Sequence, residues 1–185
     1  MYLRLAVLSI ICSLTIVPSL CAQTDFIFTK AFDKKLKKYG LQYIQPEDLW
    51  LHPVPHEDEY DSYDLVLYSE DQDLEVRYIF RDKNSTIALS AMPQFEFYRS
   101  ILDFASNEDE TNQIVIQDVP TETANEAYNA DWCLIAEFTP KQSISLMPKG
   151  RILGIYKEQT GLIFCMVFYK NEVPEYFISP IKFSL

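Results

Sequence analysis

Glycine and histidine are both scarce in this sequence, whose 185 residues include only four glycines and two histidines. So few glycines exclude a flexible or repeat-built chain. The sequence also lacks the Gly-x-Ser-x-Gly, His-Glu-x-x-His and Cys-x-x-Cys motifs, and it has no glycine-rich phosphate loop. We therefore identify no catalytic residue from motifs and expect no cofactor.

Basic side chains are few relative to acidic ones, 16 against 27, which gives a formal net charge of −11. This sign disfavours nucleic acid or an anionic membrane surface as a partner, because both require basic patches. Long hydrophobic runs are also missing, since the longest one, Leu5 to Val17, falls short of the roughly 20 residues of a spanning helix. We expect no integral membrane span.

The first 22 residues predict a cleaved signal peptide, with Arg4 ahead of the apolar run and a cleavage site after Ala22. Cys21 offers an alternative as the lipidated first residue of a lipoprotein. The places where a lipobox needs a large apolar and then a small residue hold Pro18 and Leu20, which disfavours that lipid anchor. We expect an exported protein, periplasmic or extracellular, with one domain over residues 23–185.

Two cysteines remain after the predicted cleavage, Cys133 and Cys165. An oxidising compartment favours a disulfide, but these residues fall on the first and third strands of a predicted three-stranded meander. Their Cα atoms should then lie at least about 9 Å apart, whereas a disulfide needs less than about 7 Å. The pattern predicts two buried thiols that form no disulfide.

Alternating and helical hydrophobic periods divide the chain into elements of two kinds. Helices are predicted over Asp25–Tyr39 and Pro93–Ser106, and a short helix that residues 171–174 open is predicted to run through Ile178. Strands are predicted over Leu41–Gln45, Ser62–Glu70, Asp73–Arg81, Gln113–Val119, Trp132–Phe138, Arg151–Lys157 and Leu162–Tyr169. Residues 120–129 are either loop or one helical turn, and residues 181–185 form a packed tail. Segregated antiparallel strands with helices on the sheet indicate an α+β fold.

Periodicity also assigns side chains to faces. In the strand Asp73–Arg81, the residues expected on one face are Leu74, Val76, Tyr78 and Phe80. In the helix Pro93–Ser106, the expected buried stripe is Phe97, Ile101, Leu102 and Ala105.

Two groups of residues are candidates for ligand binding. Asn129, Asp131 and Trp132 place polar groups beside a large aromatic ring at the start of the meander, a combination found in ligand sites and also in ordinary turns. Arg77 and Arg81 share one strand face with Glu75, so they could clamp an anion or pair with acidic side chains.

One loop is a candidate for metal binding, because His52, His56, Glu57 and Asp58 bring imidazoles and carboxylates together. Its prolines exclude helix and interior strand, and acidic loops are commonly just solvated. A dyad of Cys133 or Cys165 with a histidine is disfavoured, since both thiols fall within apolar strands.

The order of these elements resembles the PsbP-like proteins. The front half is a short strand ending in Tyr-Ile-Gln-Pro-Glu-Asp-Leu-Trp (residues 43–50), then a hairpin and a central helix; the back half is the meander and the closing segment 174–183. The resemblance implies a curved antiparallel sheet between helices, an α/β/α sandwich. Plant members are accessory subunits of the water-oxidising complex, so the resemblance implies a non-enzymatic binding module.

We therefore expect a non-catalytic accessory protein that binds a protein partner in the cell envelope. Two alternatives stay open. One is a protein that binds a small ligand or a divalent metal, either on the concave face of the sheet or in the loop of residues 52–61. The other is a hydrolase without a recognised motif.

Overall fold

The computed structural model describes residues 30–44, 51–54, 62–69, 73–85, 91–108, 112–171 and 180–184. The helices in these ranges are α1 (Lys30–Lys38), α3 (Pro93–Phe104) and α4 (Thr121–Tyr128). The strands are β1 (Leu41–Tyr43), β2 (His52–Pro53), β3 (Leu65–Ser69), β4 (Leu74–Asp82), β5 (Val115–Val119), β6 (Trp132–Phe138), β7 (Lys149–Lys157), β8 (Gly161–Tyr169) and β9 (Ile181–Phe183). The predicted leader and the predicted helix at residues 174–178 lie outside the described ranges.

Seven strands form one open antiparallel sheet in the order β2-β3-β4-β8-β7-β6-β5. The predicted hairpin is β3–β4, and the predicted meander is β6–β7–β8, so both are confirmed. Strand β8 joins them, because it pairs with β7 on one side and with β4 along nine residues on the other. A separate two-stranded ribbon pairs β1 with β9, for example Leu41 with Phe183.

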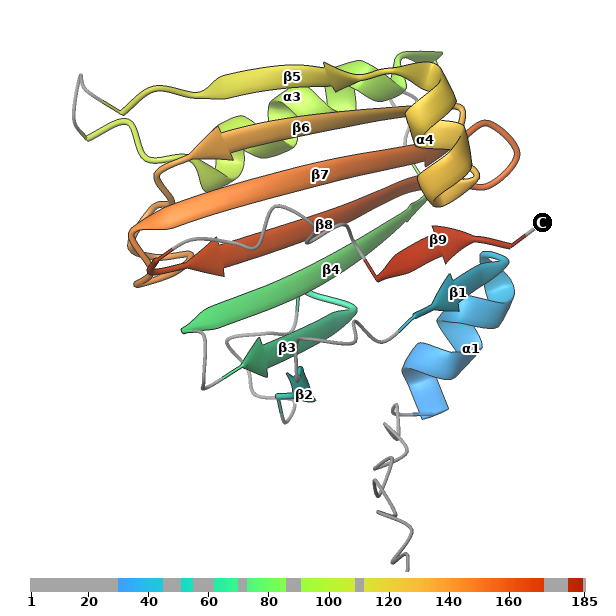
Figure 1. The fold of residues 1–185 in the computed structure, drawn as a ribbon, viewed down its shortest axis with the longest axis horizontal. Coiled ribbons are helices and arrows are strands. Elements are labelled where there is room, and N and C mark those ends of the chain that lie inside the picture. The colour runs from blue at the N-terminus through green and yellow to red at the C-terminus, as the bar shows by residue number, and fades with distance from the viewer. Residues whose placement is uncertain are drawn as a thin grey trace, which may run out of the picture.

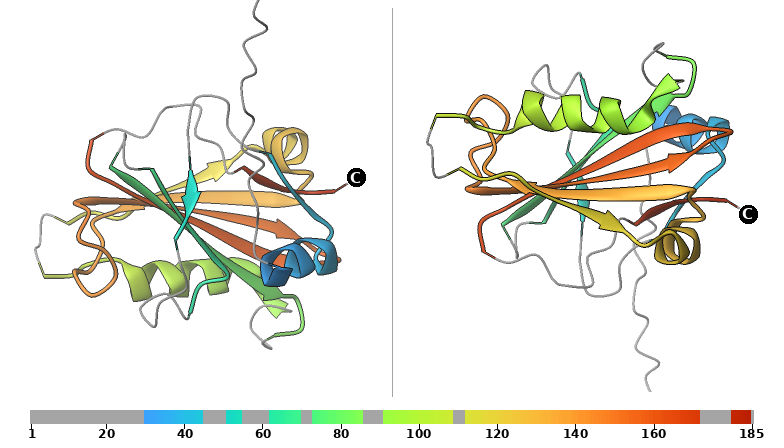
Figure 2. Two further views of the ribbon diagram at one scale, coloured as in Figure 1. Left: turned by 90° about the horizontal axis from the view of Figure 1, so that it is seen from below. Right: turned by 90° about the horizontal axis from the view of Figure 1, so that it is seen from above.

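Helices cover both faces of the sheet, which confirms the α+β class. Helix α3 lies against one face, while α4 and the β1–β9 ribbon lie on the other (Figures 1 and 2). Helix α1 packs with α4 and the ribbon, since Phe32 and Leu36 are buried in the same cluster as residues of those elements. Lys35 also pairs with Asp64, whose second carboxylate oxygen accepts the Phe80 N–H at 2.5 Å.

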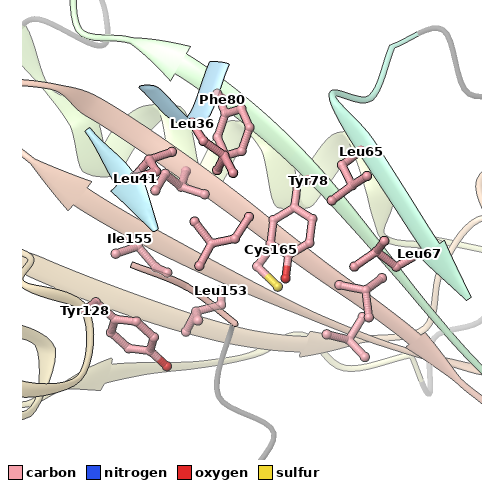
Figure 3. Close-up of a cluster of buried hydrophobic side chains, with 14 of the residues drawn as sticks. Leu36, Leu41, Leu65, Leu67, Tyr78, Phe80, Tyr128, Leu153, Ile155 and Cys165 are labelled. Carbon is pink, nitrogen blue, oxygen red and sulfur yellow. The ribbon is translucent and has the colours of Figure 1, made fainter. Parts of the chain in front are cut away.

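The core on the ribbon side contains the predicted alternate residues of β4, namely Leu74, Val76, Tyr78 and Phe80. Figure 3 shows part of this cluster, in which Tyr78 of β4, Cys165 of β8 and Leu153 of β7 lie side by side on one face of the sheet. Burying such apolar side chains stabilises the fold by about 1.5–3 kcal/mol each.

The core on the α3 side is centred on Phe97, which stacks on Phe164 with ring centroids 6.3 Å apart. Gly154 of β7 lies directly beneath this ring, where a Cβ atom would overlap it. The absence of a side chain at Gly154 is therefore what lets α3 sit this close to the sheet.

The thiols of Cys133 and Cys165 are both buried, and no disulfide joins them. Their strands β6 and β8 are separated by β7, as the meander requires. The prediction made from strand order is confirmed.

The structure refines two expectations about elements and corrects a third. Of the alternatives for residues 120–129, a helix is observed, α4 (Thr121–Tyr128), which is longer than one turn and ends where Asn129 takes the left-handed conformation at φ 52°. The tail is packed as expected, and its residues Ile181–Phe183 also pair with β1 as strand β9. The expectation of a loop was wrong at His52 and Pro53, which form the short strand β2 at the edge of the sheet, where a proline is tolerated.

The predicted buried stripe of α3 was wrong at one position. Phe97, Ile101 and Ala105 are buried, but Leu102 is 66% exposed. Leu102 follows Ile101 by 100° around the helix, which turns it away from the sheet.

Candidate functional site

Asn129 and Asp131 both make structural hydrogen bonds at the junction of α4 and β6. The Asn129 side-chain N–H donates to the Ser184 carbonyl at 2.6 Å, and the Asn129 carbonyl accepts from Lys157 Nζ at 3.0 Å. The Asp131 carboxylate accepts the Glu158 N–H at 2.7 Å. These bonds tie the junction to the C-terminal segment and to the β7–β8 turn.

Trp132 packs on the other side of the sheet from the Asn129–Ser184 contact. Its ring stacks on Tyr156 with centroids 5.2 Å apart and an interplanar angle of 17°, and it packs against the core under α3. The indole N–H is buried and has no hydrogen-bond partner among the described residues. The structure therefore separates Trp132 from the Asn129–Ser184 contact, while Asp131 and Trp132 both contact Tyr156, the first through its N–H to the Tyr156 carbonyl at 2.9 Å.

Arg77 is engaged by an acidic side chain of its own strand. Its guanidinium donates to both carboxylate oxygens of Glu75, at 2.8 and 3.1 Å, and its Cζ lies 4.8 Å from the Tyr63 ring centroid and 4.9 Å from that of Phe168. Only 3% of the Arg77 side chain is exposed. Of the two readings, pairing with an acid is the one observed, while Arg81 of the same strand is exposed.

Of the four candidate metal ligands in the loop, only His52 lies in the described ranges. His52 is exposed in β2, whereas His56, Glu57 and Asp58 lie outside the described ranges. Within those ranges no group of three or more His, Cys, Asp or Glu side chains could hold a metal ion. The proposed ligand set stays a prediction.

Burial determines the acidity of the Cys133 thiol in the core. Burial, and to a smaller extent the neighbouring Cys165, raises the pKa of the Cys133 thiol to about 12. A nucleophilic cysteine needs a thiolate, which such a pKa suppresses near neutrality. Cys133 is therefore a packing residue in this structure.

Exposed apolar side chains form the feature that sequence reasoning missed. Nine large hydrophobic residues are exposed in the described part of the chain, and seven of them fall between residues 92 and 116. These seven are Met92, Phe95, Tyr98, Leu102, Ile114, Val115 and Ile116. Val115 points to the opposite face of β5 from Ile116, so we call the other six the α3–β5 surface.

The α3–β5 surface combines one side of a helix with one end of the sheet. Phe95, Tyr98 and Leu102 recur at helical spacing on the side of α3 that faces away from the core. Ile116 pairs with Ala136, which is buried in the same cluster as Phe97 of α3. Because directly paired residues point to the same face, Ile116 lies on the face of the sheet that α3 covers.

Two signals in the sequence point to this surface. The helix carries apolar residues on more than one side, so they cannot all be buried against one sheet. The run Ile114, Val115 and Ile116 breaks strict alternation, which places apolar side chains on both faces of a strand. Neither signal says which positions remain exposed.

Comparison of the whole chain with family models, curated proteins and solved structures finds no match. In the described residues no helix is long and apolar enough to cross a membrane.

Proposed function

We propose that this chain is an exported, non-catalytic binding protein of the cell envelope that engages a protein partner through the α3–β5 surface. The observation that carries the proposal is that this surface has six exposed large hydrophobic residues, three of which, Phe95, Tyr98 and Leu102, share one side of α3. Proteins rarely leave neighbouring large apolar side chains uncovered unless they serve an interaction.

Charge supports a protein rather than a membrane as the partner. A formal net charge of −11 repels anionic lipid. Around the apolar stripe of α3, Arg99 and Asp103 are exposed, and a polar rim around an apolar centre is usual for protein–protein interfaces. We therefore expect the partner to present an apolar patch of its own.

Two further observations support a non-catalytic role. The Cys133 thiol has its pKa raised to about 12, and Arg77 is held by Glu75 in a buried pair. The Cys133 thiol packs in the core and the Arg77 guanidinium pairs with Glu75, so both groups have structural roles. We also propose a relationship to the accessory proteins of the PsbP-like family, which the presence of helices on both faces of the sheet supports.

Site-specific photo-crosslinking in the native host tests the proposal. A photoreactive amino acid at Leu102 should give a discrete adduct with a second protein, while the same group at Ile44 should give none. Ile44 is a control because it is 52% exposed and lies beside the β1–β9 ribbon, on the other face of the sheet from α3. Equal yields from both positions, or no adduct at Leu102, would contradict the proposal.

A further inference from the structure

Strand β5 is an open edge of the seven-stranded sheet. It pairs with β6 on one side and with no described strand on the other, and it is the last strand of the sheet in Figure 1. An edge strand directs alternate N–H and C=O groups outward, where another strand can pair with them. Val115, Ile116, Gln117 and Asp118 are all exposed, so side chains do not bury this edge.

The two edges of the sheet differ in how they are protected. The opposite edge is β2, which has two residues, one of them Pro53 without an N–H. Strand β5 has five residues and contains no proline, lysine or arginine. Short edges, prolines and lysines are the usual devices against strand addition, so β2 is protected and β5 is not.

The chain segment that contains β5 carries charge of one sign. Residues 105–131 contain seven acidic residues and no Lys or Arg. Asp118 on β5 and Glu122 and Glu126 on α4 are exposed. A second copy of this chain would bring the same charges against each other, which disfavours self-pairing, whereas a cationic segment would be attracted.

We propose that β5 accepts an extended segment of a partner protein as an additional strand of the sheet. The segment carries β-branched or aromatic side chains at alternate positions and Lys or Arg at its ends. Main-chain hydrogen bonds would supply affinity, and the exposed side chains Val115 and Ile116, one on each face, would select the alternate residues. This inference rests on the proposed function and names the class of its partner.

A selection experiment tests the inference. A random peptide library displayed on phage is selected against the protein, and the enriched peptides are synthesised with and without N-methyl groups at alternate backbone positions. Binding is then compared among wild type, Ile116→Lys, Leu102→Lys and Leu146→Lys. All three positions are exposed, so the variants should fold, which circular dichroism checks.

The inference predicts enriched peptides that combine alternating apolar residues with Lys or Arg. Their affinity should fall about tenfold or more in Ile116→Lys. It should also fall on N-methylation and on raising the salt concentration. Leu146→Lys should bind like wild type.

Other outcomes overturn the inference and separate it from the proposed function. Peptides that lose affinity in Leu102→Lys but are insensitive to Ile116→Lys and to N-methylation would leave the proposed function standing and remove strand addition. Recovery of no binding peptide would also remove strand addition, while the crosslinking test would still decide the proposed function. Self-association that Ile116→Lys abolishes would show that the occupant is a second copy.

Discussion

Arg77 and Glu75 form a buried charged pair on the face of the sheet that α3 covers. Two hydrogen bonds and two flanking aromatic rings hold the guanidinium. A buried pair of this kind adds little net stability compared with apolar residues, but removing one partner leaves the other charge without compensation. The pair therefore fixes the local packing and is not available as an anion clamp.

The substitution Arg77→Met should lower the free energy of unfolding by about 3–5 kcal/mol, because the Glu75 carboxylate is left buried without its partner. Urea denaturation followed by circular dichroism measures this loss. The double variant Glu75→Leu/Arg77→Met should recover much of it. A loss below about 1 kcal/mol in the single variant would show that the pair is solvated.

The Cys133 thiol should make stability depend on alkaline pH. Its pKa is raised to about 12 in the folded protein against a reference value of 9.0. Between these values the unfolded chain binds fewer protons than the folded one, so the stabilisation is complete below about pH 9 and is lost as the pH rises toward 12. Thermal unfolding should show this decline, and Cys133→Ala should make it shallower.

Tyr43 also has its pKa raised, chiefly by burial, so part of the alkaline decline should remain in Cys133→Ala. An unchanged slope in the variant would contradict the assignment. Reaction of Cys133 with a thiol reagent in the native protein at neutral pH would contradict it as well.

Helix α3 is positioned by the close approach of Phe97 to Gly154. The substitution Gly154→Ala should lower the free energy of unfolding by about 1–3 kcal/mol, since its Cβ atom would overlap the ring. Adding Phe97→Leu should restore part of that loss if the clash is the cause. Chemical denaturation measures the free energy of unfolding of both variants.

Gly40→Ala is a matched control for this element. Nothing lies within 4 Å of a Cβ atom at Gly40, whose φ is +58°, so only backbone strain of about 1–2 kcal/mol is expected. Phe97→Leu should give no recovery there. Equal recovery in both backgrounds would show that Phe97 and Gly154 are not coupled.

The sequence predicts those elements whose partners are near in the chain. The β3–β4 hairpin and the β6–β7–β8 meander follow from alternation and turn residues, which are local signals. The pairing of β4 with β8 and of Leu41 with Phe183 joins distant segments. No local period encodes such a pairing, so the ribbon and the full strand order could not be predicted.

The same distinction between local signals and the assembled structure applies to the candidate site. The residues that looked chemically promising make structural hydrogen bonds, Arg77 to Glu75 of its own strand and Asn129 to the distant Ser184. The α3–β5 surface arises because Leu102 and Ile116 remain exposed once the sheet is assembled. Ile116 is exposed because β5 is the last strand of the sheet, and Leu102 is exposed because its side of α3 faces away from the sheet. Both follow from how the elements are assembled and not from the local sequence.

Among the described strands, the sheet has a short, proline-containing edge at β2 and an edge at β5 with which no described strand pairs. The proposed binding surface at β5 and α3 consists of exposed side chains that lie outside the core clusters. Substitutions at exposed positions such as Ile116 should therefore change binding without changing stability.

Hydrogen exchange of β5 tests the binding account most directly. In the free protein, the amides of Val115–Val119 that point away from β6 should exchange rapidly, because no described strand pairs with them. Saturation with an enriched cationic peptide should slow their exchange at least about tenfold, while the amides of α1 stay unchanged. Unchanged exchange in β5 with the peptide bound would contradict strand addition at this edge.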